Sequence, residues 1–245
     1  YVTLEADGSC TVEDDGRGIP TELHKKGVAA ARVVLSTLHA GGKFDNAAYK
    51  TSGGLHGVGS SVVNALSNKM DVYISRNGNV YHDSYEKGVP KTELVKGLLP
   101  VIAKTKRTGT KINFLPDDTI FEKTAFRTDW LKSRLHETAY LNPSLYIHYK
   151  NLRDEIKEEI VYHEEDGISA YVKELNKGKE TLHDPIYIKG LSDRIEVEVA
   201  IQFVDAFEEN ILGFCNNIFT QEGGTHIVGF KTRFTQMINT YAREL

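Results

Sequence analysis

Residues 52–59 read Ser-Gly-Gly-Leu-His-Gly-Val-Gly and run directly into an apolar segment with helical spacing at 62–66. Backbone N–H groups of a glycine-rich turn at a helix N-terminus bind anions, so a polyphosphate is the natural ligand of such a turn. The glycine spacing is G-x-x-G-x-G, not G-x-G-x-x-G, and no Gly-Lys-Ser/Thr closes a P-loop. The stretch therefore predicts a phosphate site on a fold that is neither a Rossmann fold nor a P-loop fold.

Two more motifs lie on the N-terminal side of this stretch. Residues 14–20 read Asp-Asp-Gly-Arg-Gly-Ile-Pro, where a carboxylate can accept a hydrogen bond from an exocyclic amine and glycines let the backbone approach a flat ligand. Residues 39–44 read His-Ala-Gly-Gly-Lys-Phe, where a lysine on a glycine hinge can reach a phosphate. Taken singly, the motif at 14–20 is better explained as an ordinary polar turn, Lys43 as a solvated lysine and His56 as a spacer. Their joint order favours a nucleotide site.

The pattern of strands and helices predicts an α+β protein with two domains. Strands and helices come in runs without strict βαβ alternation, and the acidic patch at 164–166 followed by Gly167 indicates the domain boundary. Hairpin turns are expected at Asp7-Gly8 and Asn77-Gly78. The predicted strands are 2–6, 9–13, 70–76, 80–85, 110–115, 144–150, 156–163, 186–189, 195–204 and 210–215. The predicted helices are 28–38, 62–66, 124–141, 168–177 and 225–245, and residues 86–109 are less regular.

Composition excludes several classes of protein. The chain has 245 residues, of which 40% are hydrophobic and 26% charged, so it can bury a core and is not disordered. The net charge of −4 excludes a strongly basic chain that coats nucleic acid. We expect no membrane span and no signal peptide. Cys10 and Cys215 each lie in an apolar stretch, which predicts two buried thiols and no disulfide, metal or nucleophile chemistry.

Together with Leu-His-Ala-Gly-Gly-Lys-Phe at 38–44, Gly-Thr at 109–110 and Gly-Gly-Thr-His at 223–226, these motifs resemble the ATPase (B) subunit family of bacterial type IIA DNA topoisomerases, which includes the B subunits of gyrase and topoisomerase IV. The resemblance covers essentially the whole chain. It implies a GHKL (Bergerat) ATP-binding sandwich at 1–166, followed by part of a ribosomal-S5-like transducer domain at 167–245. In the transducer domain, we expect 223–226 to be structural.

The resemblance also implies a role for each residue of the site. Asp14 would accept the adenine amino group, assisted by Thr110 through an ordered water, while Gly16 and Gly18 admit the base. Arg17 would line the rim of the pocket, and Arg76 would contact coumarin-type inhibitors at its mouth. An ATP lid is expected at about 41–59, mobile without nucleotide. The remaining residues of the implied ATP site are Ile19 and Pro20 as an apolar wall, Lys43 and Tyr49 on the lid, and Gly54, Leu55, His56, Gly57, Val58, Gly59 and Ser60 around the phosphates.

For the parent protein, the resemblance implies an ATP-hydrolysing topoisomerase with Mg²⁺ in the bacterial cytoplasm. It would form a homodimer through the ATPase region and a heterotetramer with the DNA-cleaving A subunit, bind double-stranded DNA and be a target of ATP-site inhibitors. No catalytic or metal residue is assigned: the general-base glutamate and the Mg²⁺-binding asparagine are expected before Tyr1, and the γ-phosphate contacts of the transducer after Leu245. These 245 residues alone would bind nucleotide weakly without hydrolysing it.

Two alternatives stay open at this point. A chaperone, a mismatch-repair ATPase or a histidine kinase shares the ATP fold, although those families do not combine the motifs at 38–44 and 52–59. A nucleotide-gated dimerisation module without turnover is the alternative of a different class. A few basic residues could line a DNA cavity, but scattered charges of this kind usually form a solvated face. These residues are Lys104, Lys106, Arg107, Lys231 and Arg233.

Overall fold

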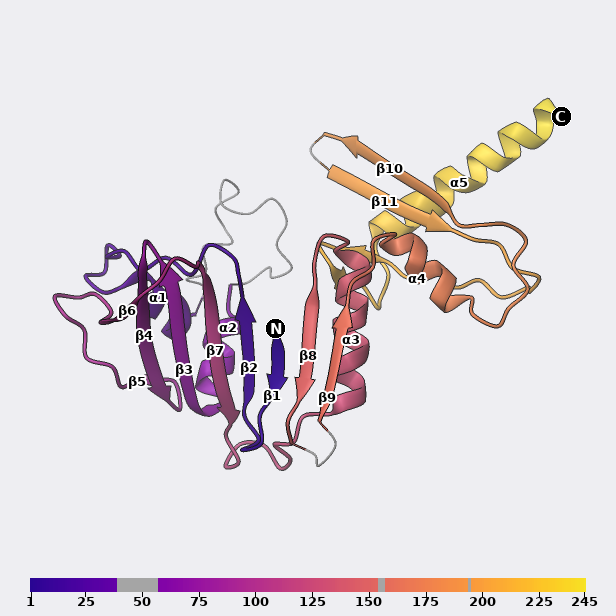
Figure 1. Cartoon of the computed structure of the whole chain (residues 1–245). Coiled ribbons are helices and arrows are strands. Elements are labelled where there is room, and N and C mark those ends of the chain that lie inside the picture. Colours follow the sequence, from indigo (N-terminus) through magenta and orange to yellow (C-terminus); the bar gives the residue numbers. More distant parts are fainter. Residues whose placement is uncertain (39–56, 154–156, 194) are drawn as a thin grey trace. The chain divides into compact units, whose positions relative to one another are not determined.

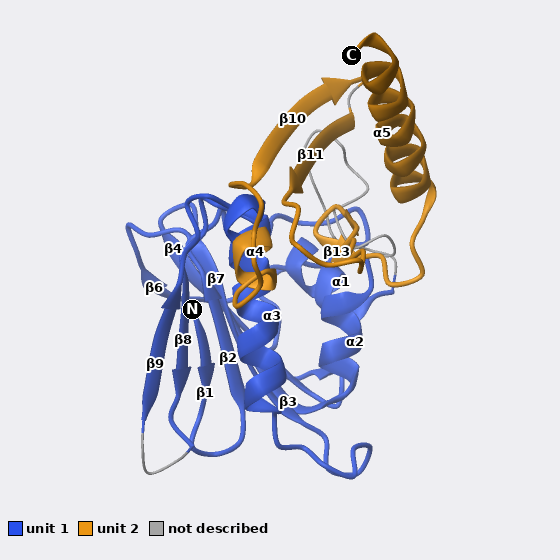
Figure 2. Cartoon of the chain, turned by 90° about the vertical axis from the view of Figure 1, so that its right-hand side faces the viewer, with its two compact units in different colours: residues 1–48, 54–171 blue, residues 49–53, 172–245 orange. Residues whose placement is uncertain are grey.

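The chain folds into two compact units, with the boundary between Tyr171 and Val172 inside helix α4 (Ile168–Leu175) (Figure 2). The computed structural model describes residues 1–38, 57–153, 157–193 and 195–245. Among them, no helix is long and apolar enough to cross a membrane.

Unit 1 is built on a nine-stranded sheet (Figure 1). The strand order is β5-β4-β3-β7-β2-β1-β8-β9, with β6 paired to β4. Neighbouring strands run antiparallel except β1 and β8, which pair in parallel and join the early and late parts of the unit. The strands are β1 (Val2–Leu4), β2 (Cys10–Asp14), β3 (Ser67–Arg76), β4 (Asn79–Glu86), β5 (Val89–Pro90), β6 (Val101–Lys104), β7 (Gly109–Pro116), β8 (Ile147–Asn151) and β9 (Glu158–Tyr162).

The helices of unit 1 lie on one face of the sheet (Figure 2). They are α1 (Ala30–Ser36), α2 (Gly59–Ala65) and α3 (Thr128–Leu141). Asp129 lies in the first turn of α3, where a negative charge favours the helix dipole, and Asn142-Pro143 ends the helix. Because no helix of the described residues covers the opposite face, the sheet shows the alternation of apolar and polar residues that is typical of antiparallel sheets, as in β3.

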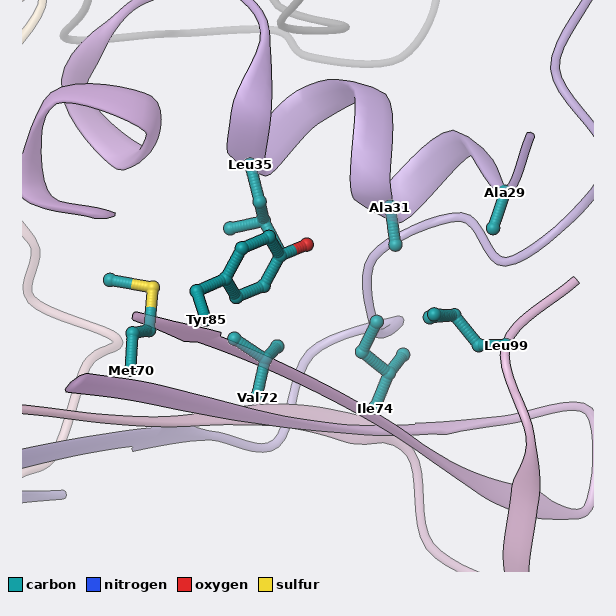
Figure 3. Close-up of a cluster of buried hydrophobic side chains, with 8 residues drawn as sticks. All are labelled: Ala29, Ala31, Leu35, Met70, Val72, Ile74, Tyr85 and Leu99. Carbon is teal, nitrogen blue, oxygen red and sulfur yellow. The ribbon is translucent and has the colours of Figure 1, made fainter. Parts of the chain in front are cut away.

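Two clusters of buried side chains fill the space between helices and sheet. In the first, the small side chains of Ala29 and Ala31 let α1 lie close to the sheet, and Leu35 packs with Val72 and Tyr85 (Figure 3). In the second, Leu4, Cys10 and Tyr149 are covered by α3 through Leu131 and Leu135, among others. Each fully buried leucine or valine side chain contributes roughly 1.5–3 kcal/mol to folding.

A buried ion pair ties α1 to β4. Arg32 donates through Nε to Asp83 Oδ2 at 3.1 Å and through Nη2 to Asp83 Oδ1 at 2.6 Å. Asp83 is completely buried and also accepts from the Tyr85 hydroxyl at 2.5 Å and from the backbone N–H of Ser84 at 3.1 Å. Burial and the neighbouring carboxylate raise the pKa of Tyr85, so its hydroxyl stays a donor.

Unit 2 contains two hairpins and a long helix. The strands β10 (Ile186–Ser192) and β11 (Ile195–Ile201) pair antiparallel, as do β12 (Phe214–Cys215) and β13 (Ile218–Phe219). Helix α5 spans Thr225–Glu244, and its first turn packs on the second hairpin through His226, whose Nε2 lies 3.1 Å from Thr220 Oγ1. None of the residues in β10, β11 or α5 is buried.

The two predicted turns are confirmed. Asp7-Gly8 lies in the connection 5–9 between β1 and β2, where Gly8 has positive φ and Asp7 does not, and β1 is shorter than the predicted 2–6. Asn77-Gly78 connects β3 to β4 with both residues at positive φ, 51° and 76°. A two-residue turn with positive φ at both positions follows the twist of the strands that it joins. The α+β class is therefore established by short-range signals of this kind together with the helices at 30–36, 128–141, 168–175 and 225–244.

Several predicted elements need correction. The strand predicted at 210–215 is reduced to β12, because Asn216 and Asn217 at positive φ turn the chain back at once into β13. Cys215 is consequently exposed rather than buried, whereas Cys10 is buried. The less regular stretch 86–109 contains β5 and β6. Other differences are at element ends: α1 is shorter than 28–38, α2 starts at Gly59, α3 starts at Thr128, β8 starts at Ile147, β9 spans 158–162 and β11 ends at Ile201.

Candidate nucleotide site

The ends of three neighbouring strands bring together residues far apart in the sequence. In the register of the sheet, Thr110 on β7 lies opposite Asp14 on β2 and opposite Ile74 on β3. Gly109 lies opposite Ser75 on β3. The turn at 14–20, the end of β3 and the start of β7 therefore share one end of the sheet.

Asp14 uses one carboxylate oxygen to shape this end of the sheet. Its Oδ1 accepts from the backbone N–H of Gly16 at 2.8 Å and from the backbone N–H of Thr110 at 3.3 Å. These two hydrogen bonds orient the carboxylate without requiring Oδ2. The side chain is exposed, so Oδ2 is accessible to a ligand that donates a hydrogen bond.

Two glycines are required by close approaches of the backbone. A Cβ on Gly18, whose φ is +72°, would lie 2.7 Å from the carbonyl oxygen of Ser75. A Cβ on Gly109, whose φ is +146°, would lie 2.0 Å from the carbonyl oxygen of Asp14. Sequence reasoning assigned Gly18 to the approach of a ligand, and the structure adds that the turn itself packs against β3 only because this residue is glycine.

Thr110 and Ile19 connect the turn to the core. The backbone N–H of Ile19 donates to Thr110 Oγ1 at 3.2 Å, and the Ile19 side chain packs against the cluster under α1. Thr110 is almost completely buried. Since its oxygen accepts this bond, its hydroxyl proton is available to an acceptor of a ligand. The pair thus presents an acceptor and a donor side by side.

Arg76 lies against the same turn. Its Nη1 donates to the carbonyl oxygens of Arg17 at 3.2 Å and Gly18 at 3.0 Å, and its Nη2 donates to Glu22 Oε1 at 3.2 Å. The pKa of Glu22 is lowered, first by a hydrogen bond from its own backbone N–H and further by Arg76. Sequence reasoning did not single out Glu22: it lies in a polar stretch in which nothing marks it as a partner of Arg76.

The predicted site residues divide into three groups. The structure brings together Asp14, Gly16, Arg17, Gly18, Ile19, Arg76 and Thr110, with Pro20 next to them in the chain. Gly57 and Val58 precede α2, and Gly59 and Ser60 form its first turn, so the glycine run does lead into a helix as predicted. Lys43, Tyr49, Gly54, Leu55 and His56, with the lid expected at about 41–59 as far as residue 56, lie outside the described residues.

No group of three or more His, Cys, Asp or Glu side chains with the arrangement of a metal site occurs in the described parts of the chain. The described residues of the site offer hydrogen-bonding groups and backbone shape. A flat heterocycle that carries an amino donor beside a ring acceptor fits the Asp14 and Thr110 pair.

Comparisons with known proteins find relatives for both parts of the chain. The family described as histidine kinase-, DNA gyrase B-, and HSP90-like ATPase matches residues 1–120, and the family described as DNA gyrase B matches residues 167–245. The B subunit of DNA topoisomerase 4 from Staphylococcus aureus, in strains MW2 and Mu50, is 50% identical over the whole chain. The chain spans 36% of the length of these relatives.

A solved structure gives the same result for the fold. The 43K ATPase domain of Thermus thermophilus gyrase B, in complex with an aminocoumarin, superimposes with a TM-score of 0.83 at 33% identity. The match covers 99% of this chain and 61% of that one. The fold and the family matches define a GHKL-type ATPase domain. More specifically, the chain belongs to the family of B subunits of bacterial type IIA DNA topoisomerases, the subunits of gyrase and topoisomerase IV that carry the ATPase region.

Proposed function

We propose that this chain is the ATP-binding region of a type IIA topoisomerase that couples nucleotide binding to closure of a dimer and to DNA strand passage. The observation that carries the proposal is the Asp14 and Thr110 pair, held side by side by the β2–β7 register and by the hydrogen bond from Thr110 N–H to Asp14. An acceptor next to a donor matches the amino group and ring nitrogen of adenine and opposes the carbonyl and N–H of guanine.

In this proposal, the chain's own residues bind and orient the nucleotide. Asp14 Oδ2 accepts from the adenine amino group, and the Thr110 hydroxyl acts through an ordered water. Gly16, Gly18, Ile19 and Pro20 form the surface against the base, and Arg17 lies at the rim. The phosphates belong to the glycine run and the lid, at Lys43, Tyr49, Gly54, Leu55, His56, Gly57, Val58, Gly59 and Ser60.

The parent protein would supply the rest of the activity. We assign residues 1–166 to the ATP-binding domain and 167–245 to part of the transducer. Bound nucleotide would bring Mg²⁺, and nucleotide binding would close a homodimer that works with an A subunit on double-stranded DNA in the bacterial cytoplasm. ATP-site inhibitors, including aminocoumarins such as the one bound by the Thermus thermophilus domain, would occupy the same site and contact Arg76.

The test is a calorimetric titration of the protein with ADP, GDP and an aminocoumarin. ADP should bind at least tenfold more tightly than GDP, because GDP would place its carbonyl against Asp14 Oδ2 and its N–H against a donor. The aminocoumarin should compete with ADP. Equal affinity for ADP and GDP would overturn the assignment of the base site. A dimerisation module without turnover would show the same binding, but the complete protein would release no phosphate from ATP.

A further inference from the structure

One peptide group of the candidate site is held from both sides. The peptide that joins Gly18 to Ile19 directs its carbonyl oxygen to Arg76 Nη1 and its N–H to Thr110 Oγ1. The carbonyl of the preceding peptide, at Arg17, is bound by the same Nη1. Gly18 adopts positive φ, and because a glycine has no side chain, its own backbone preferences restrict the turn little. These contacts therefore fix the orientation of the peptide plane.

The guanidinium group suits this task. Its planar arrangement of N–H donors binds the two backbone carbonyls on one edge and a carboxylate on another, which the single ammonium of a lysine would not reproduce. Arg76 is the last residue of β3, so its backbone is fixed by the sheet, and its side chain is 25% exposed. The donor is therefore anchored in the sheet, whereas its acceptors belong to the turn.

Glu22 completes the arrangement. Its carboxylate accepts from Arg76 Nη2, and its backbone carbonyl accepts from the N–H of Ala30 at 2.8 Å, at the first residue of α1. The ion pair thus connects the end of β3 to the chain segment that leads from the turn into α1. Without Glu22, the Arg76 side chain would keep two neutral acceptors and lose its charged one.

We propose that Arg76 is a positioning residue for the adenine site: by holding the Gly18–Ile19 peptide, it directs the Ile19 N–H at Thr110 and so sets the orientation of the Thr110 hydroxyl, with Glu22 orienting Arg76. The proposal rests on the proposed function and deepens it, since it assigns Arg76 a role in the protein without inhibitor. Arg76 acts through Thr110 and needs no contact with the nucleotide.

The test compares Arg76→Gln with Lys111→Gln. Lys111 follows Thr110 in β7, so its replacement removes an equal charge close to the site, but it pairs only loosely with Glu13, at 3.9 Å. ADP affinity should fall about tenfold in Arg76→Gln, as expected for loss of charge-assisted hydrogen bonds, and less than about twofold in Lys111→Gln. The preference for ADP over GDP should also fall in Arg76→Gln, which a simple loss of stability would not cause.

Hydrogen exchange provides the second measurement. In the nucleotide-free protein, the Ile19 amide should exchange about tenfold faster in Arg76→Gln than in the wild type, because its bond to Thr110 loses its orientation. Thr110→Val, which removes the acceptor, should show the same acceleration, and Lys111→Gln should show none. Glu22→Gln should have a smaller effect in the same direction.

The outcomes are separable. Unchanged Ile19 exchange in Arg76→Gln overturns the positioning role, and so does a loss of ADP affinity that Lys111→Gln matches, since this would be a general charge effect. If the wild type does not distinguish ADP from GDP, the proposed function fails, whereas the exchange of Ile19 still decides whether Arg76 holds the turn.

Discussion

The carboxylates of Asp14 and Asp83 lie on the same sheet but in opposite environments. Asp83 is completely buried, and both of its oxygens are occupied, by Arg32, by the Tyr85 hydroxyl and by the backbone of Ser84. Asp14 is exposed, and the two hydrogen bonds that it makes with described residues both go to Oδ1. A carboxylate whose oxygens are all satisfied by the protein stabilises the fold, whereas one that keeps an accessible oxygen can select a ligand. The predictions below test this difference.

The largest effect is expected at Asp83. Asp83→Ala leaves the charge of Arg32 and the Tyr85 hydroxyl in the core without their acceptor, and breaking a buried pair in this way costs about 3–5 kcal/mol of unfolding free energy. Urea unfolding of the variant and the wild type measures the difference.

A double variant serves as the control for Asp83. Arg32→Met with Asp83→Leu replaces the whole pair by apolar side chains and should recover most of the loss, because such replacements are often neutral. If the double variant is no more stable than Asp83→Ala, the attraction between Arg32 and Asp83 itself stabilises the fold, and the loss in Asp83→Ala is not only the cost of an unpaired buried charge.

At Asp14, the loss should appear in binding instead of stability. Asp14→Asn can keep the two bonds to Oδ1 but presents an NH₂ donor to the adenine amino group, so ADP and adenine-competitive inhibitors should bind about 30–100-fold more weakly. Unfolding free energy should change by less than about 1 kcal/mol. Calorimetry and urea unfolding on the same samples check both values. Asp15→Asn, next in the chain, is the matched control, and equal affinities in the two variants would remove Asp14 from the site.

Gly18 contributes both to the stability of the fold and to the shape of the candidate site, because a glycine here lets the turn at 14–20 lie close to β3. Gly18→Ala should cost about 1–3 kcal/mol, from positive φ and from contact with the Ser75 carbonyl. Gly78→Ala is the matched control: φ is +76° there, but a Cβ would meet nothing within 4 Å. The difference between the variants in urea unfolding measures the close approach alone, and equal losses would show that it is unimportant.

How far the sequence predicts these roles depends on how local each one is. The turn at 77–78 and the motif at 14–20 are encoded by neighbouring residues, so both were predictable. The contact of Arg76 with Glu22 depends on the packing of the turn against the end of β3, and the parallel pairing of β1 with β8 joins distant segments, so no local pattern indicates either. The same limit explains Cys215: an apolar stretch indicated a buried strand, but the turn at Asn216 and Asn217 left the thiol exposed.

The smallest effect concerns the ion pair of Glu22 with Arg76. The pKa of Glu22 in the folded protein lies below its ordinary value of 4.5, so the fold favours the ionised carboxyl. Its contribution is therefore present above about pH 4.5 and is lost as the pH falls through the folded pKa. Because the Glu22 side chain is 54% exposed, solvent screening keeps this contribution below about 1 kcal/mol.

Glu22→Gln isolates this contribution, because the amide has the shape of the carboxyl but cannot ionise. In urea unfolding from about pH 6 to pH 3, the variant should be slightly less stable than the wild type at the upper end, and the two should converge as Glu22 becomes protonated. When Arg76 is also replaced by Gln, most of the stability difference caused by Glu22→Gln should disappear, because the ion pair is gone. The stability difference that remains comes from the hydrogen bond between the Glu22 carboxylate and its own backbone N–H. A gap that stays constant over the whole pH range would mean that the charge of Glu22 plays no part in holding Arg76.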